Sequence, residues 1–299
     1  VTVEFWLKKA AFTTAKTEKE VIFDLWNGET PATTGYGRLR VELDGTATGS
    51  PFLVSCQSGS SGFSNQVVGS AITTSTLQDW THYAVSLKND SSTSKIRTRL
   101  YVNGVLNHEQ SLGNTIGEVT GSLIANIGAL RGATTSATVG TVAEGYGKLS
   151  GSMDEFRYWK AERSIKEVGR HWFKQYAGGT NTDLANTTLG VYYKFNEGCT
   201  GTASIDQTIL DYSGRLTNGL WIGYPGCDAR ALESAIVLAG AAEREFKDPI
   251  LYSFHADVAT KKETISKSAQ EYDDNNSSSI YSTIPTWIVD FKKIVQLVI

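Results

Sequence analysis

Two adjacent carboxylates, Asp154 and Glu155, are the first residues to test for catalysis. A retaining glycosidase needs two carboxyl groups about 5 Å apart. A strand supplies such a pair from residues two positions apart, because neighbouring side chains on a strand point to opposite faces. The two carboxylates are therefore predicted to face opposite ways, and the sequence predicts a protein that is not an enzyme. A glycoside hydrolase would need carboxylates brought together from different strands.

The other residue types that do chemistry are few and scattered. Four histidines are spread along the chain, and Cys56, Cys199 and Cys227 lie far apart without a C-x-x-C pair. Zinc sites and disulfide frameworks depend on closer, regular spacings, so neither is expected. The absence of a predicted disulfide framework favours a reducing place of synthesis.

Aromatic side chains are the candidates for sugar binding, because sugar rings stack on exposed aromatic rings. Five rings are predicted at outward or loop positions: Trp6, Trp26, Tyr36, Tyr101 and Trp221. Single apolar residues on a surface are also common without any function. Glycan binding by each ring is therefore a hypothesis.

Four arginines could form a basic strip on one sheet face: Arg38, Arg40, Arg97 and Arg99. The alternative is a solvated face on which each arginine has a cross-strand glutamate partner. The sequence favours the second interpretation.

The elements that position these residues are predicted to be β-strands. Apolar and polar residues alternate with a period of two, as in strands with one buried face. The alternating runs are residues 3–8, 21–25, 38–43, 83–87 and 96–102. Turn-forming residues separate the runs, and Asn103-Gly104 is typical of a tight hairpin. Many short strands joined by turns predict an antiparallel sandwich or barrel.

Two segments have clear helical patterns, whereas residues 229–246 could be an apolar helix or a strand with a Gly break. Ser164 and Glu167 form a capping box, and an apolar stripe from Ile165 to Tyr176 predicts a helix that ends at Gly178-Gly179. Beyond Pro285, apolar residues recur every three to four positions and predict an amphipathic helix.

A succession of segments resembles the laminin G-like and pentraxin-like domains of the concanavalin A-like lectin and glucanase family. The segments are TVEFWLK (2–8), DWTHYAVSL (79–87), LYVNGVL (100–106), IGAL (127–130) and GSMDEFRYWKAERSIKEV (151–168). The resemblance covers roughly residues 1–178 and implies an all-β, antiparallel jelly-roll β-sandwich. With the helical patterns, we expect one short helix and a partly helical C-terminal extension.

The same resemblance implies a calcium site. In the family pattern, the Asp of G-x-x-D-E and the Asp of D-x-S-G lie at loops that can converge, and here they match Asp154 and Asp211, with Asn218 in the following Gly turn. Calcium prefers such oxygen ligands. The alternative is that Asp211 forms an Asx-turn with Ser213 and that Asp154 accepts backbone N–H groups.

Two domains are predicted, residues 1–224 and residues 225–299. Residues 190–219, GVYYKFNEG…LDYSGRLTNG, also resemble the family. We expect residues 190–224 to close the first sandwich; the alternative is that they begin a truncated second copy. Residues 225–299 are predicted to be an extension for assembly or docking, because an apolar helical stripe needs a partner to bury it.

The whole arrangement is similar to structural proteins of tailed bacteriophages, including EFKDPILYSFHADV (245–258) and IPTWIVDF (284–291). This similarity implies a structural component of a virion, in the tail, the baseplate or the capsid decoration, synthesised in the host cytoplasm. Its implied partners are other virion subunits and further copies of the chain, bound through residues 280–299. The alternative, compatible with the first, is a carbohydrate-binding module for host-surface glycans.

Charge and hydropathy argue against two classes of partner. The net charge is -3 and the sequence pI is about 5.9, so no overall basic field attracts nucleic acid or anionic membrane. No apolar run approaches the roughly 20 residues of a membrane helix. The sequence starts within a strand pattern without Met and ends on two apolar residues, so we expect both ends to be cut from a longer chain.

Overall fold

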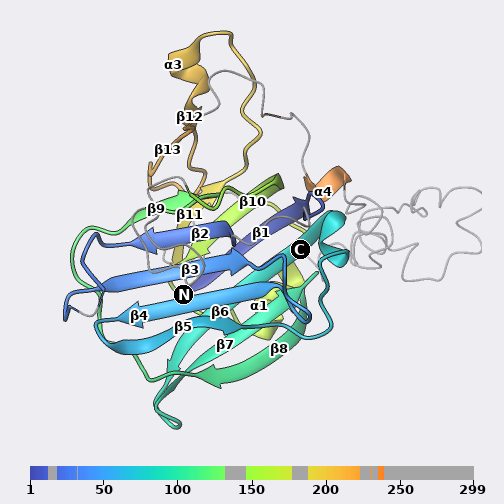
Figure 1. Cartoon of the computed structure of the whole chain (residues 1–299). Helices are drawn as coiled ribbons and strands as arrows, with labels where there is room; N and C mark the ends of the chain where they lie inside the picture. The colour runs from blue at the N-terminus through green and yellow to red at the C-terminus, as the bar shows by residue number, and fades with distance from the viewer. Residues whose placement is uncertain are drawn as a thin grey trace, which may run out of the picture. The chain divides into compact units, whose positions relative to one another are not determined.

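The computed structural model describes residues 1–12, 19–31, 33–131, 146–176, 188–222, 230 and 235–238. The chain divides into two compact units, Val1–Ala235 and Ile236–Ile299, and Ile236–Leu238 are the described residues of the second unit. The first unit is built on two antiparallel β-sheets (Figure 1).

One sheet has six strands in the order β11-β10-β1-β6-β7-β8, and the other has five in the order β5-β4-β3-β2-β9. The six are β1 (Thr2–Lys9), β6 (Thr81–Asp90), β7 (Lys95–Val102), β8 (Val105–Leu112), β10 (Gly151–Trp159) and β11 (Leu189–Tyr193). The five are β2 (Glu20–Trp26), β3 (Gly37–Leu43), β4 (Phe52–Ser58), β5 (Ser61–Val67) and β9 (Ile124–Ile127). The predicted antiparallel jelly-roll sandwich is therefore confirmed.

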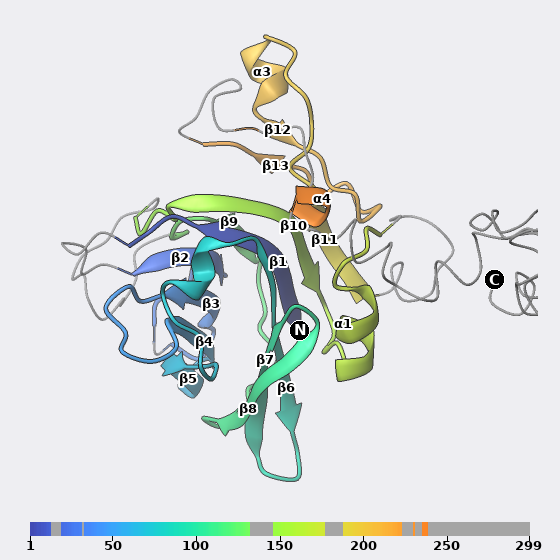
Figure 2. The ribbon, with the colours of Figure 1, turned by 90° about the vertical axis from the view of Figure 1, so that its right-hand side faces the viewer.

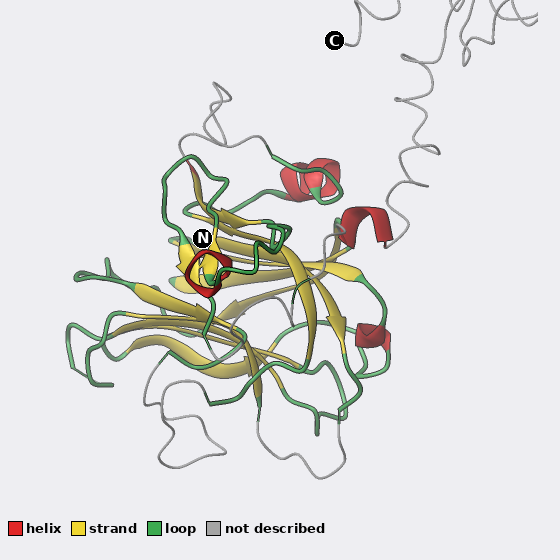
Figure 3. Cartoon of the chain, turned by 90° about the horizontal axis from the view of Figure 1, so that it is seen from above, coloured by secondary structure: helices red, strands yellow, loops and turns green. Residues whose placement is uncertain are grey.

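Helices make up little of the described chain (Figure 3). The remaining elements are η1 (Thr76–Gln78), α1 (Ile165–His171), α3 (Ala203–Asp206), β12 (Thr208–Ile209), β13 (Gly219–Leu220) and α4 (Ala235–Leu238). β12 and β13 pair with each other, and Figures 1 and 2 both show them, with α3, projecting beyond the edge of the two large sheets.

The core fills the space between the inner faces of the two sheets. Inward residues alternate along each strand, as Val3, Phe5 and Leu7 do on β1. Phe52 of β4 meets Tyr83 of β6 with ring centroids 4.9 Å apart, so one aromatic pair joins the two sheets. Each such buried side chain stabilises the fold by roughly 1.5–3 kcal/mol relative to its exposed state.

The hairpin between β7 and β8 turns at Asn103-Gly104, as the sequence predicts. Both residues have positive φ, 47° and 80°, which is the backbone of a type I′ turn. Gly104 is needed for a second reason: a Cβ there would lie 2.2 Å from Cδ1 of Trp172.

The helix α1 begins as predicted but ends early. Ser164 caps it and forms the capping box with Glu167, whereas the last helical residue is His171 and not a residue near Gly178. Beyond the helix, the Lys174 carbonyl accepts a hydrogen bond (2.7 Å) from Arg157 on β10. Figure 2 shows α1 on the outer side of the six-stranded sheet.

One cysteine differs from expectation. Cys56 is free and buried in the core, but Cys199 is disulfide-bonded. The sequence predicted no disulfide framework and did not indicate this bond, because spacing along the chain does not reveal which cysteines the fold brings together.

Candidate functional site

Three of the five aromatic rings predicted to face outward are buried. Trp6 and Tyr101 do project from the outer face of the six-stranded sheet, but α1 and the residues after it cover that face. Trp172 stacks on Trp6 with centroids 5.5 Å apart, and Tyr101 packs against Val168. Tyr36 is buried as well. The prediction that these rings are open to a sugar was wrong, because strand alternation does not show whether another segment covers a face.

Trp221 is half-buried against the core. Phe195 stacks on its ring with centroids 6.3 Å apart and planes 15° apart. The guanidinium of Arg230 lies 5.9 Å from the ring centroid. Because Phe195 takes up one face of the ring, at most the other face is left for a ligand.

Trp26, at the end of β2, is half-buried on the outer face of the five-stranded sheet. Leu25 beside it packs on the core, so alternation turns Trp26 outward. Trp26 pairs with Arg38 on β3 and with Ile124 on β9, and Ile124 is 50% exposed. The indole N–H donates to the Glu29 carbonyl at 2.8 Å. The ring and the aliphatic side chain thus form an open apolar edge beside a polar face.

We call this surface the Trp26 face. It comprises Asp24, Trp26, Arg38, Arg40, Glu42, Gln57, Asn65 and Ile124. Gln57 pairs with Arg38 across β3 and β4 and is half-buried. Trp26, Arg38 and Gln57 therefore form one row across three neighbouring strands.

Two ion pairs fix the polar side chains of the Trp26 face. Arg38 donates two hydrogen bonds to Asp24, Nε to Oδ1 at 2.8 Å and Nη2 to Oδ2 at 2.5 Å, and its guanidinium lies 5.0 Å from the Trp26 ring centroid. Arg40 pairs with Glu42. Burial alone disfavours the charged form of Arg38, but the bonds to Asp24 outweigh it and raise the pKa of Arg38. Both arginines are held in one geometry.

A lysine and an amide complete this network. Asn65 Oδ1 accepts from Lys19 Nζ at 3.0 Å and from Arg40 Nη2 at 3.3 Å. Asn65 has positive φ, 51°, at a register shift between β4 and β5. Burial lowers the pKa of Lys19, so this cation is stabilised less than an exposed lysine.

The four arginines of the predicted strip lie on two different sheets. Arg38 and Arg40 are buried on the five-stranded sheet with acidic partners. Arg97 and Arg99 lie on β7 of the six-stranded sheet. A continuous basic strip is therefore excluded.

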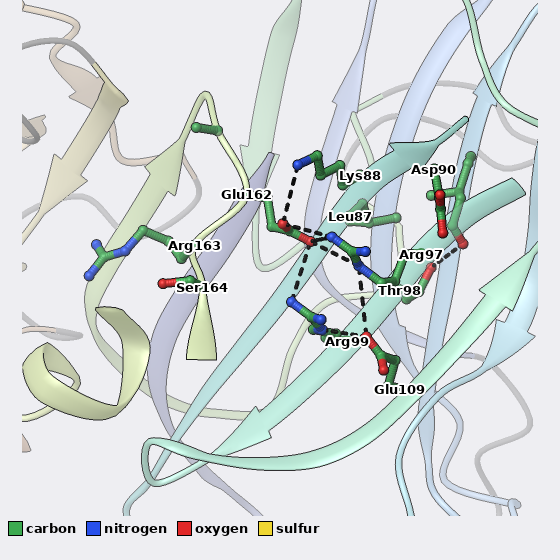
Figure 4. Close-up of polar contacts among 12 residues, drawn as sticks. Leu87, Lys88, Asp90, Arg97, Thr98, Arg99, Glu109, Glu162, Arg163 and Ser164 are labelled. Carbon is green, nitrogen blue, oxygen red and sulfur yellow. Dashed lines mark hydrogen bonds and ion pairs between the residues drawn. The ribbon is translucent and has the colours of Figure 1, made fainter. Parts of the chain in front are cut away.

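The second pair of arginines has the glutamate partners that the sequence favoured. Arg99 donates to Glu109, its cross-strand neighbour on β8, at 2.6 Å. Glu162, which precedes α1, is shared by Arg97 at 3.0 Å, Arg99 at 3.6 Å and Lys88 at 3.9 Å (Figure 4). This network ties the loop before α1 to the sheet and balances most of its own charge.

A second set of charges is fully buried between α1 and the six-stranded sheet. We call Glu4, Glu155, Arg157 and Arg163 the buried ion cluster; all four are buried. Arg157 contacts Glu155 at 2.8 Å and Glu4 at 3.4 Å, and Arg163 lies 3.8 Å from Glu4. His82 lies beside the cluster, and burial, with Arg157 and Arg163 acting in the same direction, lowers its pKa well below the usual range. His82 is therefore neutral at pH 7.

The carboxylates of Asp154 and Glu155 lie on the same side of the sheet, which corrects the prediction that they face opposite ways. Asp154 pairs with Trp6 and Arg157 pairs with Glu4, so β10 has one more residue than β1 over this stretch. This β-bulge holds Glu155 at φ 52° and turns both carboxylates outward. The alternation of side chains between the two faces of a strand does not hold at a β-bulge.

The two carboxylates are nevertheless closed in by hydrogen bonds. Glu155 accepts from Tyr192 Oη at 2.5 Å, from Gln175 Nε2 at 2.6 Å and from Arg157. Asp154 accepts from the backbone N–H groups of Glu155 and Ala235. Both residues are buried, so this pair presents no open carboxylate to a substrate.

Asp154 is easier to protonate than an ordinary aspartate. Burial raises its pKa to about 7, the hydrogen bond from Ala235 opposes the rise, and the charge of Glu155 adds to it. An unfolded aspartate titrates near 3.8, so between about pH 4 and pH 7 the folded state binds more protons than the unfolded state. The free energy of unfolding therefore falls as the pH rises through this window.

The predicted calcium ligands fall into two separate places. Asp211 lies beside Asn218, whose Oδ1 accepts from the Asp211 backbone N–H at 2.9 Å. Asp211 pairs with Tyr193 of β11, and β11 lies between Asp211 and β10. Because strands are about 4.8 Å apart, two strand spacings separate Asp211 from the strand of Asp154, roughly 10 Å.

Hydrogen bonds occupy both oxygens of Asp211. Oδ1 accepts from the backbone N–H groups of Tyr192 and Ser213, and Oδ2 accepts from Ser213 Oγ and the Thr217 N–H, all at 2.8–3.0 Å. This arrangement is the Asx-turn that the sequence allowed as the alternative. Among the described residues, no group of three or more His, Cys, Asp or Glu side chains is placed to hold a metal ion.

The sequence reasoning missed most of the Trp26 face. Asp24 and Trp26 are two residues apart on a strand whose other face was predicted to be apolar, and Arg38 and Arg40 stand in the same relation on the next strand. The same period of two could have grouped them on one surface. The order of the strands, which places β2 beside β3 and β9, could not be predicted from this periodicity.

Comparisons with known proteins agree with this architecture. Residues 1–169 match the model of the concanavalin A-like lectin/glucanases superfamily. No curated protein matches the chain. No described helix is long and apolar enough to cross a membrane.

Several solved structures are distantly similar. A Bacteroides ovatus protein proposed to bind carbohydrate is 16% identical with a TM-score of 0.35; the match covers 78% of this chain and 62% of that protein. A heptameric pentraxin of Limulus polyphemus is 12% identical with a TM-score of 0.29, over 56% of this chain and 67% of its own. The sialidase module CBM40 of Ruminococcus gnavus, bound to sialyllactose, is 16% identical with a TM-score of 0.33. The match covers 57% of this chain and 81% of that module.

Likenesses this distant say nothing about the ligand of the present chain. The family model, in contrast, matches more than half of the 299 residues and includes every strand of the two large sheets except β11. The chain belongs to the concanavalin A-like lectin/glucanases superfamily.

Proposed function

We propose that this chain is a non-catalytic carbohydrate-binding domain and that the Trp26 face is its site. The observation that carries the proposal is the row of Trp26, Arg38 and Gln57 across three strands, next to the exposed Ile124. A sugar ring has an apolar C–H face and a rim of hydroxyls. The edge formed by the half-buried indole, the exposed Ile124 and the half-buried Gln57 complements both parts, and the buried Arg38 supports the ring from beneath.

The ion pairs of this face support binding indirectly, by fixing the residues that lie under the Trp26 ring. Arg38 is fixed by two bonds to Asp24 and Arg40 by its pair with Glu42. All four side chains are buried, so they act beneath the surface: they hold the strands and the Trp26 ring in one geometry for a ligand that contacts Trp26 and Gln57.

The charge of the face favours a neutral glycan. Each of the two arginines is already matched by one carboxylate, and Lys19 is buried with a lowered pKa. A sugar carboxylate would have to compete with Asp24 or Glu42 for its arginine, whereas hydroxyl groups need no free charge. Binding is then expected to depend little on salt, because screening acts mainly on exposed charges.

A glycan array with two matched tryptophan variants tests the proposal. The wild-type chain is expected to bind neutral glycans, Trp26→Ala to lose at least about tenfold in affinity, which is 1.4 kcal/mol, and Trp221→Ala to bind like the wild type. Loss of glycan affinity in Trp221→Ala alone would place the site at Trp221 instead of Trp26. Absence of binding to any glycan would overturn the proposal.

The non-catalytic part of the proposal needs a separate measurement. Incubation of the chain with each glycan that it binds is expected to release no new reducing ends. Their appearance would show that a pair of carboxylates acts as a hydrolase, and Asp154→Asn would then test whether the bulge on β10 supplies one of them.

The predicted structural role in a phage virion stays a prediction. It depends on residues 225–299, of which the structure describes residue 230 and residues 235–238. The virion location, the virion subunits as partners and the oligomer through residues 280–299 depend on the same part of the chain. Carbohydrate binding by the sandwich is compatible with all of them.

A further inference from the structure

The small sheet β12–β13 carries an apolar outer face. Ile209 packs in the core and Trp221 packs against it. The backbone N–H of Trp221 donates to the Gln207 carbonyl at 2.8 Å, which extends the pairing beyond the two strands. Alternation then turns Leu220 and Ile222 to the opposite, outer side.

The side chains on and beside this outer face are unusually exposed for their size. Leu220 is 62% exposed, Ile222 74% and Leu210 42%, and Leu216 in the connecting loop is 82% exposed. Summed over the four side chains, the exposed apolar surface is roughly 450–500 Å². We call these four residues the hairpin patch.

The loop that presents Leu216 is held in place by buried partners. Leu216 has positive φ, 60°, an uncommon backbone for a leucine. The next residue, Thr217, donates its N–H to Asp211 and accepts from Tyr193 Oη at 2.6 Å. The fold therefore fixes this apolar side chain toward solvent, so its exposure is not the result of a loose loop.

Charge decides what kind of partner fits the hairpin patch. Within residues 208–222 the charged residues are Asp211 and Arg215; Asp211 is buried, and Arg215 Nε donates to the Leu189 carbonyl. A nucleic acid or an acidic peptide would find little to bind here. The same patch on another molecule is complementary, because apolar surface meets apolar surface.

We propose that two copies of this chain associate through the hairpin patch in an isologous dimer. Two such patches would bury roughly 1,000 Å² from these side chains alone, at the lower limit for a specific interface. An interface of this size is expected to be reversible. The dimer would display two sandwiches and increase the avidity for a repeating ligand, although the association itself does not depend on the proposed glycan site.

Sedimentation of the full chain over a concentration series tests this dimer. Leu220→Asp is expected to raise the dissociation constant at least tenfold, because an isologous contact buries two carboxylates. Leu216→Ser, which changes a loop residue, is expected to weaken it less and tests the patch independently of the strands. Val105→Asp is the matched control: Val105 is 68% exposed, lies outside the patch, and should leave the constant unchanged.

Cross-linking provides the second measurement. A residue near a two-fold axis meets its own copy, so Leu220→Cys or Ile222→Cys is expected to form a disulfide-linked dimer under mild oxidation, and Val105→Cys is not. A wild-type chain that stays monomeric at about 100 μM, or association unchanged in both Leu220→Asp and Leu216→Ser, would overturn the proposal.

Discussion

Replacement of Arg157 by methionine tests how far the buried ion cluster determines stability. Methionine keeps much of the aliphatic volume of arginine but removes the charge and the donors. Arg157 is fully buried and contacts Glu155, Glu4 and the Lys174 carbonyl. Its loss leaves two buried carboxylates with one remaining cation of the cluster, Arg163.

The magnitude follows from that imbalance. Removal of one partner from a buried ion pair costs about 3–5 kcal/mol, because the other charge stays buried without compensation. Arg163 lies 3.8 Å from Glu4 and offsets part of the loss, so we expect the lower end, about 3 kcal/mol. For a unit of this size the melting temperature should fall by roughly 6–12 °C.

Guanidinium unfolding of the full chain, followed by tryptophan fluorescence, measures the change. Arg97→Met is the matched control, because Arg97 also pairs with a glutamate beside α1, but its side chain is 26% exposed. We expect the control to lose less than about 1 kcal/mol. A loss below 1 kcal/mol in Arg157→Met, or equal losses in both variants, would refute the reasoning that burial sets the energy of this cluster.

Three further predictions concern the pH dependence of stability, calcium and the β7–β8 hairpin. Asp154→Asn should raise the free energy of unfolding at pH 8 by roughly 1–3 kcal/mol and flatten its fall between about pH 4 and pH 7; unchanged pH-dependent melting would contradict the raised pKa of Asp154. A calcium chelator should leave the melting temperature unchanged, because hydrogen bonds already occupy both oxygens of Asp211, and a clear drop would favour the calcium prediction. Gly104→Ala should destabilise the chain by about 2 kcal/mol or more in thermal melting, since the new Cβ would collide with Trp172 in a positive-φ position; a neutral result would show that Trp172 moves aside freely.

Local patterns in the sequence were enough for the strands, the hairpin and the start of the helix. Alternation over residues 38–43 depends only on which side chains favour burial, and it predicted β3. The positive φ of Asn103-Gly104 and the capping box at Ser164 are likewise properties of a few neighbouring residues. Such features can be predicted without knowing how distant segments of the chain pack.

The candidate site depended on contacts that local patterns do not contain. Trp6 and Tyr101 are outward on their strands, yet α1 and the residues after it bury them. The bulge at Glu155 reverses the expected direction of one carboxylate. Cys199 is disulfide-bonded, which the spacing of the cysteines did not indicate.

By itself, then, the sequence determined that this chain forms an antiparallel sandwich, because the alternation of apolar and polar residues sets which face of each strand is buried. Only the tertiary structure decided which outward residues remain at the surface. That outcome depends on the order of the strands and on what packs over each sheet: β2 lies between β3 and β9 and leaves Trp26 beside an exposed Ile124, whereas α1 covers Trp6.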